Sequence, residues 1–172
     1  MILSEHDEQV LNLCFNPELG FDQLYGLDLP KVEPVSETVK SMEAEAVSLA
    51  DTDSKQALSL LSNIITANPK YGSAYNNRAQ LYRLLNNTKL ALNDLESAIQ
   101  FGDVHVIGKA YSQKAIILNE LGKEEEAQCA FECGAKYGNL FCKQQAVKNN
   151  PYAAMCNAAV QKMFEKEIKS GK

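Results

Sequence analysis

The side chains best suited to chemistry in this 172-residue sequence are its five cysteines and two histidines. Cys129 and Cys133 lie four residues apart, a spacing that places two soft metal ligands on one face of a helix, with Cys142 or His105 as further ligands. A structural zinc site needs four ligands, usually two close pairs, and the sequence holds one such pair. We therefore predict no metal and no cofactor, and interpret the cysteines as small buried side chains.

Catalytic patterns give no stronger signal. His6 and His105 belong to no recognisable triad, and the sequence contains no phosphate-binding loop or dinucleotide fingerprint. The sequence thus predicts a protein that is not an enzyme.

Charge and composition narrow the remaining classes of partner. A formal net charge of −5 is unfavourable for a nucleic-acid surface, which needs clustered basic residues. An odd number of cysteines and the lack of a secretory signal predict a reducing, cytoplasmic location. No apolar run approaches the roughly 20 residues that span a bilayer, so we predict a soluble protein without membrane contact.

The helices that would position a binding site follow from an internal repeat. Small residues recur at spacings of 34 and 36, and a large apolar residue follows each by four positions: Ala57 with Leu61, Ala91 with Leu95, and Ala127 with Phe131. A second pattern recurs 36 residues later, where Tyr75, Ala79, Tyr82 and Leu85 are followed by Tyr111, Ala115, Leu118 and Leu121. A small residue such as Ala79 lets a partner helix approach closely, so each unit should pair two helices.

This pattern resembles the tetratricopeptide repeat family. The resemblance implies an all-α, short solenoid of three helix hairpins, at about 38–71, 72–107 and 108–141. We expect an N-terminal helix and an apolar, acidic capping segment over 1–34, and a C-terminal capping helix over 142–172. The first unit is the weakest, because its first helix, over about 35–50, has Ser41, Ala44 and Glu45 where the others have an aromatic residue, a basic residue and an alanine. Terminal units of stacked arrays are often atypical.

The breaks between the helices have recognisable turn residues. Asn86 and Asn87 supply a turn and an N-cap before Thr88, and Gly122 suits a left-handed backbone at the corresponding place in the third unit. Two extra residues in the second unit are expected to lengthen the loop from Gly102 through His105.

Both flanking segments have the pattern of caps, and the N-terminal one is too apolar for a free linker. Residues 15–30 contain aromatic and leucine side chains that would form a cap on the first unit or a lid in its groove. At the other end, Asn150 before Pro151 predicts a helix start, followed by an apolar stripe that would cover the last repeat. That stripe consists of Tyr152, Met155, Ala159 and Met163.

Three stretches resemble one branch of the tetratricopeptide family more narrowly: AYNNRAQ at 74–80, NPYAAMCN at 150–157 and FNPELGFDQLYGLDL at 15–29. This resemblance implies a soluble, non-enzymatic adaptor that binds Hsp70-type chaperones. Relatives that hold a chaperone's C-terminal carboxylates use lysine, asparagine and arginine side chains at five positions. Asn77 and Lys109 match that clamp, whereas Met42, Ala46 and Gln113 occupy its other positions.

The inner groove should be lined by the first helix of each unit, including Met42 and Ala46 in the first. We predict that amide and cationic side chains there bind an acidic or C-terminal peptide, namely Asn76, Asn77, Gln80, Arg83, Lys109 and Gln113. The alternative interpretation is that these side chains are ordinary solvated groups on the polar face of a helix. An alternative function is a scaffold that docks a client, or self-associates, through the apolar flanks. The sequence leaves the oligomeric state open.

Overall fold

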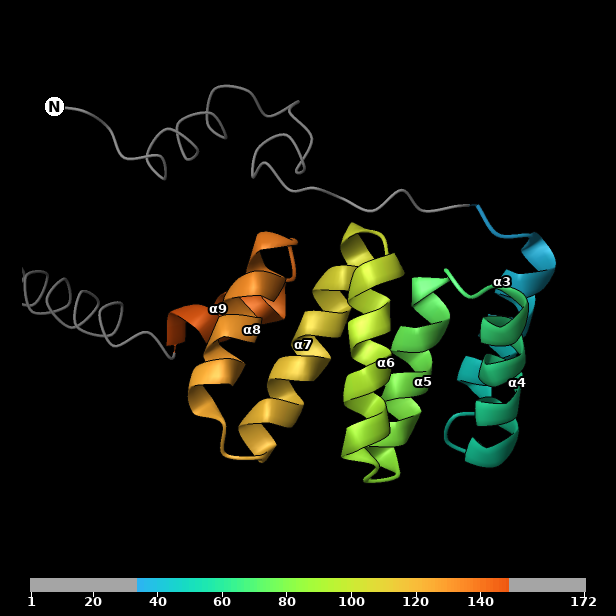
Figure 1. Ribbon diagram of the computed structural model, residues 1–172, viewed down its shortest axis with the longest axis horizontal. Helices are drawn as coiled ribbons and strands as arrows, with labels where there is room; N and C mark the ends of the chain where they lie inside the picture. The colour runs from blue at the N-terminus through green and yellow to red at the C-terminus, as the bar shows by residue number, and fades with distance from the viewer. Residues whose placement is uncertain (1–33, 149–172) are drawn as a thin grey trace, which may run out of the picture.

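The computed structural model describes residues 34–148, and every regular element in that range is an α-helix (Figure 1). The described helices are α3 (Glu37–Ser48), α4 (Ser54–Ala67), α5 (Gly72–Leu84), α6 (Thr88–Phe101), α7 (Val104–Glu120), α8 (Glu124–Lys136) and α9 (Leu140–Lys148). The predicted N-terminal cap or lid, the helix start at Asn150 and the stripe that follows it lie outside the described residues. None of the described helices is long and apolar enough to cross a membrane.

The helices stack in a row in chain order, as Figure 1 shows. Within hairpins, α3 packs on α4, α5 on α6 and α7 on α8; between hairpins, α4 packs on α5, α6 on α7 and α8 on α9. The first helices of the second and third hairpins, α5 and α7, also touch, and α7 contacts α9. The prediction of an all-α helical repeat is confirmed. The unit boundaries remain predictions, and α7 spans the one proposed between residues 107 and 108.

Small residues lie where the helices approach most closely. Ala57 and Ala91 are fully buried and Ala127 is 2% exposed, and the large side chain four positions after each fills the adjoining space. These larger residues are Leu61, Leu95 and Phe131, none more than 4% exposed. Burial of such side chains supplies the main favourable term for stacking the hairpins, because neither helix can cover its apolar face alone.

The register predicted for the first unit is wrong by one residue. Glu45, aligned with Ala79 on sequence, is exposed, whereas its neighbour Ala46 is fully buried, as are Ala79 and Ala115. The cause is a shorter separation between the two small residues of this hairpin, from Ala46 to Ala57. A carboxylate cannot enter the close helix–helix contact, so the alanine takes that position.

The turns follow the predicted residues with one difference. Gly122 has a φ of 73°, which confirms the left-handed conformation, and Asn86 occupies the corresponding place before α6 with a φ of 56°. Asn87 is the N-cap residue of α6, but its side chain accepts no capping hydrogen bond. Instead its backbone N–H donates to the carbonyl of Tyr82 at 2.8 Å, which ties the turn to the preceding helix.

The loop expected through His105 is absent, because α7 already begins at Val104. Asp103 is the N-cap residue, and its Oδ1 accepts a hydrogen bond of 2.8 Å from the N–H of Val106. The extra residues of this unit therefore lengthen the helix and leave a short connection. An aspartate at this position stabilises a helix start.

Candidate functional site

A hollow of about 360 Å³ lies where the first helices of three successive hairpins meet. Helix α3 contributes Lys40, Glu43, Ala44 and Val47, helix α5 contributes Ser73, Asn76 and Asn77, and helix α7 contributes Val106 and Lys109. Most of this lining is polar or charged. The hollow is therefore suited to a polar or charged segment rather than to a purely apolar ligand.

Several lining residues occupy equivalent positions in the three helices. Counting back from the buried alanines Ala46, Ala79 and Ala115, the positions two residues earlier are Ala44, Asn77 and Gln113. The positions six residues earlier are Lys40, Ser73 and Lys109. Residues four apart share a helix face, so these two positions form one row across the repeat, which is polar except at Ala44.

This register corrects the expected first-unit lining. Ala46 is fully buried and Met42 packs against the core formed around Ala46, so neither lines the hollow. Lys40 and Ala44, two residues further toward the N-terminus, take the positions that the sequence assigned to Met42 and Ala46. The hollow thus contains a lysine from the first unit that sequence reasoning missed.

Glu43 connects the first two hairpins within this hollow. Its Oε1 accepts hydrogen bonds from Ser73 Oγ at 2.5 Å and Asn77 Nδ2 at 2.7 Å. Its Oε2 accepts a hydrogen bond from the Tyr71 hydroxyl at 2.5 Å. Burial, reinforced by the bond to Glu43, raises the pKa of Tyr71, so this phenol stays protonated and remains a donor.

Asn76 of α5 and Gln113 of α7 link the first helices of the second and third hairpins. Gln113 Nε2 donates to the side-chain Oδ1 of Asn76 at 2.9 Å and to its backbone carbonyl at 3.2 Å. Asn76 is 6% exposed. Its side chain serves mainly to join α5 to α7, while Oε1 of Gln113 is buried without a hydrogen-bond partner among the described residues.

The other predicted binding residues are distributed unequally. Lys109 is exposed and lines the hollow, whereas Gln80 is exposed on α5 and Arg83 is half-buried near the end of that helix; neither lines it. Nε of Arg83 is buried with no hydrogen-bond partner in the described part of the chain. The hollow therefore brings Asn76, Asn77 and Lys109 together, and Gln113 adjoins them through Asn76.

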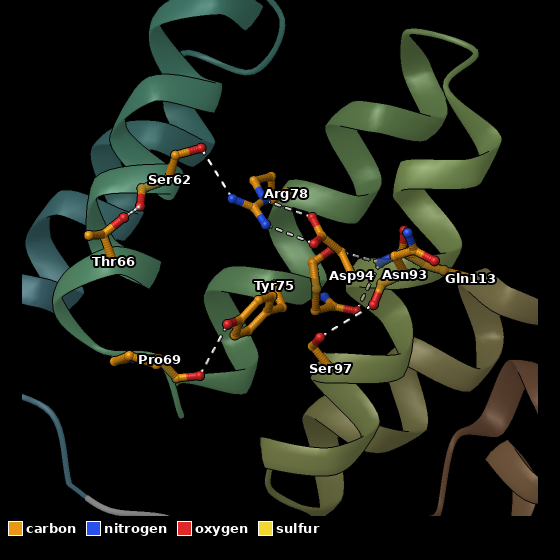
Figure 2. A network of polar contacts seen from close by, with 10 residues as sticks. Ser62, Thr66, Pro69, Tyr75, Arg78, Asn93, Asp94, Ser97 and Gln113 are labelled. Atoms are coloured by element: carbon orange, nitrogen blue, oxygen red, sulfur yellow. Dashed lines mark hydrogen bonds and ion pairs between the residues drawn. The ribbon is translucent and has the colours of Figure 1, made fainter.

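A second polar network fixes the helices behind this site (Figure 2). Arg78 of α5 lies between Ser62 of α4 and Asp94 of α6, and its guanidinium donates to both. Hydrogen bonding to Asp94 raises the pKa of Arg78. The same guanidinium lies 5.7 Å from the ring centre of Tyr75 and 5.8 Å from that of Tyr82, within cation–π range.

The cysteines are not equally buried. Cys142 is fully buried and Cys133 half-buried, but Cys129 is exposed, so the prediction of a small buried side chain is wrong for Cys129. Its place on α8 points toward solvent rather than toward the alanine-lined core. Within residues 34–148, no group of three or more potential ligands among His, Cys, Asp and Glu is placed to hold a metal ion.

Glu43, Tyr71 and Lys40 are the site residues that sequence reasoning missed. Glu43 stands 34 residues before Asn77, one residue before the position in α3 that is equivalent to Asn77, so repeat spacing placed it only near this face. Repeat spacing brings residues of successive first helices to the same face. It does not reveal that a carboxylate there meets three donors at the beginning of α5.

Stacked helix hairpins whose buried alanines recur at spacings of 34 and 36 residues, as Ala57, Ala91 and Ala127 do, have the architecture of a tetratricopeptide-type interaction repeat. No family model matches the chain. Tetratricopeptide repeat protein 36 of Danio rerio is 38% identical over 95% of the chain and 94% of its own length. The protein of that name from Homo sapiens is 33% identical over 92% and 93%, and the Drosophila melanogaster homolog is 33% identical over 96% of both. The chain belongs to the tetratricopeptide repeat protein 36 family.

Proposed function

We propose that this protein is a non-enzymatic adaptor whose hollow between α3, α5 and α7 binds an acidic peptide segment. The observation that carries the proposal is the convergence of Lys40, Asn77 and Lys109, from three successive first helices, on that hollow. Two lysines supply positive charge and the amide supplies directional hydrogen bonds. A site built in this way favours a carboxylate-bearing ligand.

The three hairpins α3–α4, α5–α6 and α7–α8 act together in this proposal. Helix α4 packs on both α3 and α5, and the hydrogen bond from Gln113 to Asn76 joins α5 to α7, so the three first helices are held in register. The backbone of the site is thus formed before a ligand arrives, which lowers the entropic cost of binding.

We infer that the partner is the acidic C-terminal segment of an Hsp70-type chaperone. Such a segment carries several carboxylates in an extended chain, which suits a row of lysine and amide groups. Lys40 adds a lysine to Asn77 and Lys109, although an exposed ion pair with Glu37 at 2.7 Å offsets part of its charge. Two positions still differ from a complete clamp, since Ala44 stands where the clamp has an asparagine and Gln113 stands where it has an arginine or a lysine.

Isothermal titration of the full chain with a peptide ending in Glu-Glu-Val-Asp tests this proposal. Binding in the micromolar range, lost when the final residue is removed, is expected because the terminal carboxylates supply most of the attraction. Added salt should weaken the binding, since exposed charges are screened. Absence of binding to the intact peptide would refute the chaperone assignment.

A charge reversal locates the binding on the groove. Lys109→Glu should abolish titration with the acidic peptide, because a carboxylate would replace a cation at the lining of the hollow. The matched control is Lys89→Glu, which makes the same change at an exposed residue of α6 that does not line the hollow. Equal losses in both variants would indicate a non-specific charge effect.

A second function, a scaffold that docks a client through apolar surface, is favoured by the outer face of α9. Leu140 is 74% exposed, Val147 50% and Phe141 43%. Binding of that kind would be insensitive to salt and to Lys109→Glu. Retention of a client by the Lys109→Glu variant therefore separates this function from the first.

A further inference from the structure

We propose that Tyr71, Ser73 and Asn77 form a carboxylate-binding seat that Glu43 occupies, and that a ligand's carboxylate binds by displacing Glu43. This inference rests on the proposed peptide-binding function and adds an internal competitor to it. Glu43 would then be the residue that sets both the affinity and the carboxylate selectivity of the hollow.

The three donors come from one short stretch of chain. Tyr71 is the N-cap residue of α5, Ser73 lies in its first turn and Asn77 one turn later. Their polar atoms lie 2.5, 2.5 and 2.7 Å from oxygens of Glu43. An ionised carboxylate only accepts hydrogen bonds, and three donors aimed at its two oxygens match that need. The N-terminal end of α5 also favours negative charge.

Glu43, which occupies the seat, is held less firmly by the surrounding helices than the donor residues that form the seat. Ser73 and Asn77 belong to α5, which packs against helices on both sides, whereas Glu43 belongs to α3, the first described helix of the stack. Glu43 is only half-buried, so its side chain has a path to solvent. Lys40, one turn earlier on α3, forms an exposed ion pair with Glu37 at 2.7 Å, and its spacing of three residues from Glu43 also brings it within reach of the displaced Glu43 carboxylate.

A ligand carboxylate would gain a contact that Glu43 does not make. Lys109 lines the same hollow, and Glu43 forms no ion pair with it. The exchange therefore replaces one carboxylate by another and adds a cation for the ligand. Because the seat is open only while Glu43 is displaced, the apparent affinity is the intrinsic affinity reduced by that open fraction.

Removal of the internal carboxylate tests the idea directly. The full-length Glu43→Ala variant should bind the Glu-Glu-Val-Asp peptide at least about tenfold more tightly than the unmodified chain, because its seat is open at all times. The matched control is Glu45→Ala, which removes the same charge from an exposed position of α3. An equal gain in Glu45→Ala would show a general charge effect and overturn the proposal.

Two further sets of measurements identify the seat and the ligand group. In the Glu43→Ala background, Asn77→Ala should cancel most of the gain, because it removes one of the three donors. A peptide with an amidated C-terminus and a peptide with Gln in place of Glu distinguish a terminal carboxylate from an acidic side chain. If neither change in the peptide reduces the gain, no carboxylate enters the seat and the proposal fails.

Glu43→Gln guards against loss of structure, because it keeps the size of the side chain and part of its hydrogen bonding. It should show a smaller gain in the same direction, with an unchanged helical signal. No gain in either variant overturns the seat. If the unmodified chain does not bind the peptide but Glu43→Ala does, the seat stands and the proposed function fails. If the unmodified chain binds the peptide and neither variant binds it more tightly, the proposed function stands and the seat fails.

Discussion

Arg78 and Asp94 form a bidentate ion pair that joins α5 to α6. Nε of Arg78 lies 2.7 Å from Oδ2 of Asp94, and Nη2 lies 2.8 Å from Oδ1. The side chains are 18% and 9% exposed, so water screens the pair little. Ser62 of α4 takes a third hydrogen bond from the same guanidinium. One arginine therefore fixes the second hairpin and attaches it to the first.

Loss of Asp94 should be among the most destabilising single changes in the described part of the chain. Asp94→Ala leaves a largely buried guanidinium unpaired, and breaking such a pair costs about 3–5 kcal/mol. Urea unfolding followed by circular dichroism measures this loss. The control is Glu126→Ala, which breaks the exposed pair with Lys123 and should cost under about 1 kcal/mol. Similar losses of unfolding free energy in the two variants would contradict the argument that burial makes the Arg78–Asp94 pair costly to break.

Gly72 permits the close approach of the beginning of α5 to the end of α6 within the second hairpin. A Cβ atom on Gly72 would lie 2.4 Å from the backbone nitrogen of Gly102. Gly72→Ala should therefore destabilise the protein by about 1–3 kcal/mol through overpacking. Helix propensity alone predicts the opposite sign, since alanine is favoured over glycine by about 1 kcal/mol. Thermal unfolding decides between the two, and an increased melting temperature would refute the steric argument.

The left-handed turns at Asn86 and Gly122 predict opposite effects of substitution. Gly122→Ala should cost about 1–2 kcal/mol, because an L-residue is strained at a φ of 73°. No atom outside Gly122 and its two chain neighbours lies within 4 Å of the position that its Cβ would take, so the cost is one of backbone conformation. Asn86→Gly should be neutral or slightly stabilising. Urea unfolding of both variants measures the change in the free energy of unfolding. A Gly122→Ala variant as stable as the unmodified chain would contradict the left-handed conformation at Gly122.

The helical stack could be predicted from sequence because its cause is periodic. Ala57, Ala91 and Ala127 recur at nearly the repeat spacing, and each is buried where two helices meet. Periodicity fails in the first hairpin, because fewer residues separate the two buried alanines of its helices than in the other hairpins. For that reason the buried residue of α3 is Ala46 rather than Glu45, and Lys40 lines the hollow.

The candidate site could be predicted only in part, because side-chain pairing depends on neighbours in other repeats. Asn77 and Lys109 were predicted to line the groove, and both line the hollow. Asn76 was predicted as a binding group, but its side chain is already engaged by Gln113. No local pattern shows that Glu43 fills the space before Asn77, since this contact joins residues 34 positions apart.

The three described cysteines should differ in their rates of alkylation. Cys129 is exposed, whereas Cys142 is fully buried and Cys133 half-buried. Burial raises the pKa of both Cys133 and Cys142, so at pH 8 a smaller fraction of each is the reactive thiolate.

Iodoacetamide labelling followed by peptide mass spectrometry should therefore modify Cys129 first and Cys142 last, with at least about a tenfold difference between them. The rate at Cys133 should rise as the pH increases past 9.0, the ordinary value for a thiol, because its folded pKa lies higher. Serine at Cys14 and Cys156 removes competing thiols outside the described residues. Equal rates at Cys129 and Cys142 in native buffer, matching those in urea, would show that the contact between α8 and α9 opens freely.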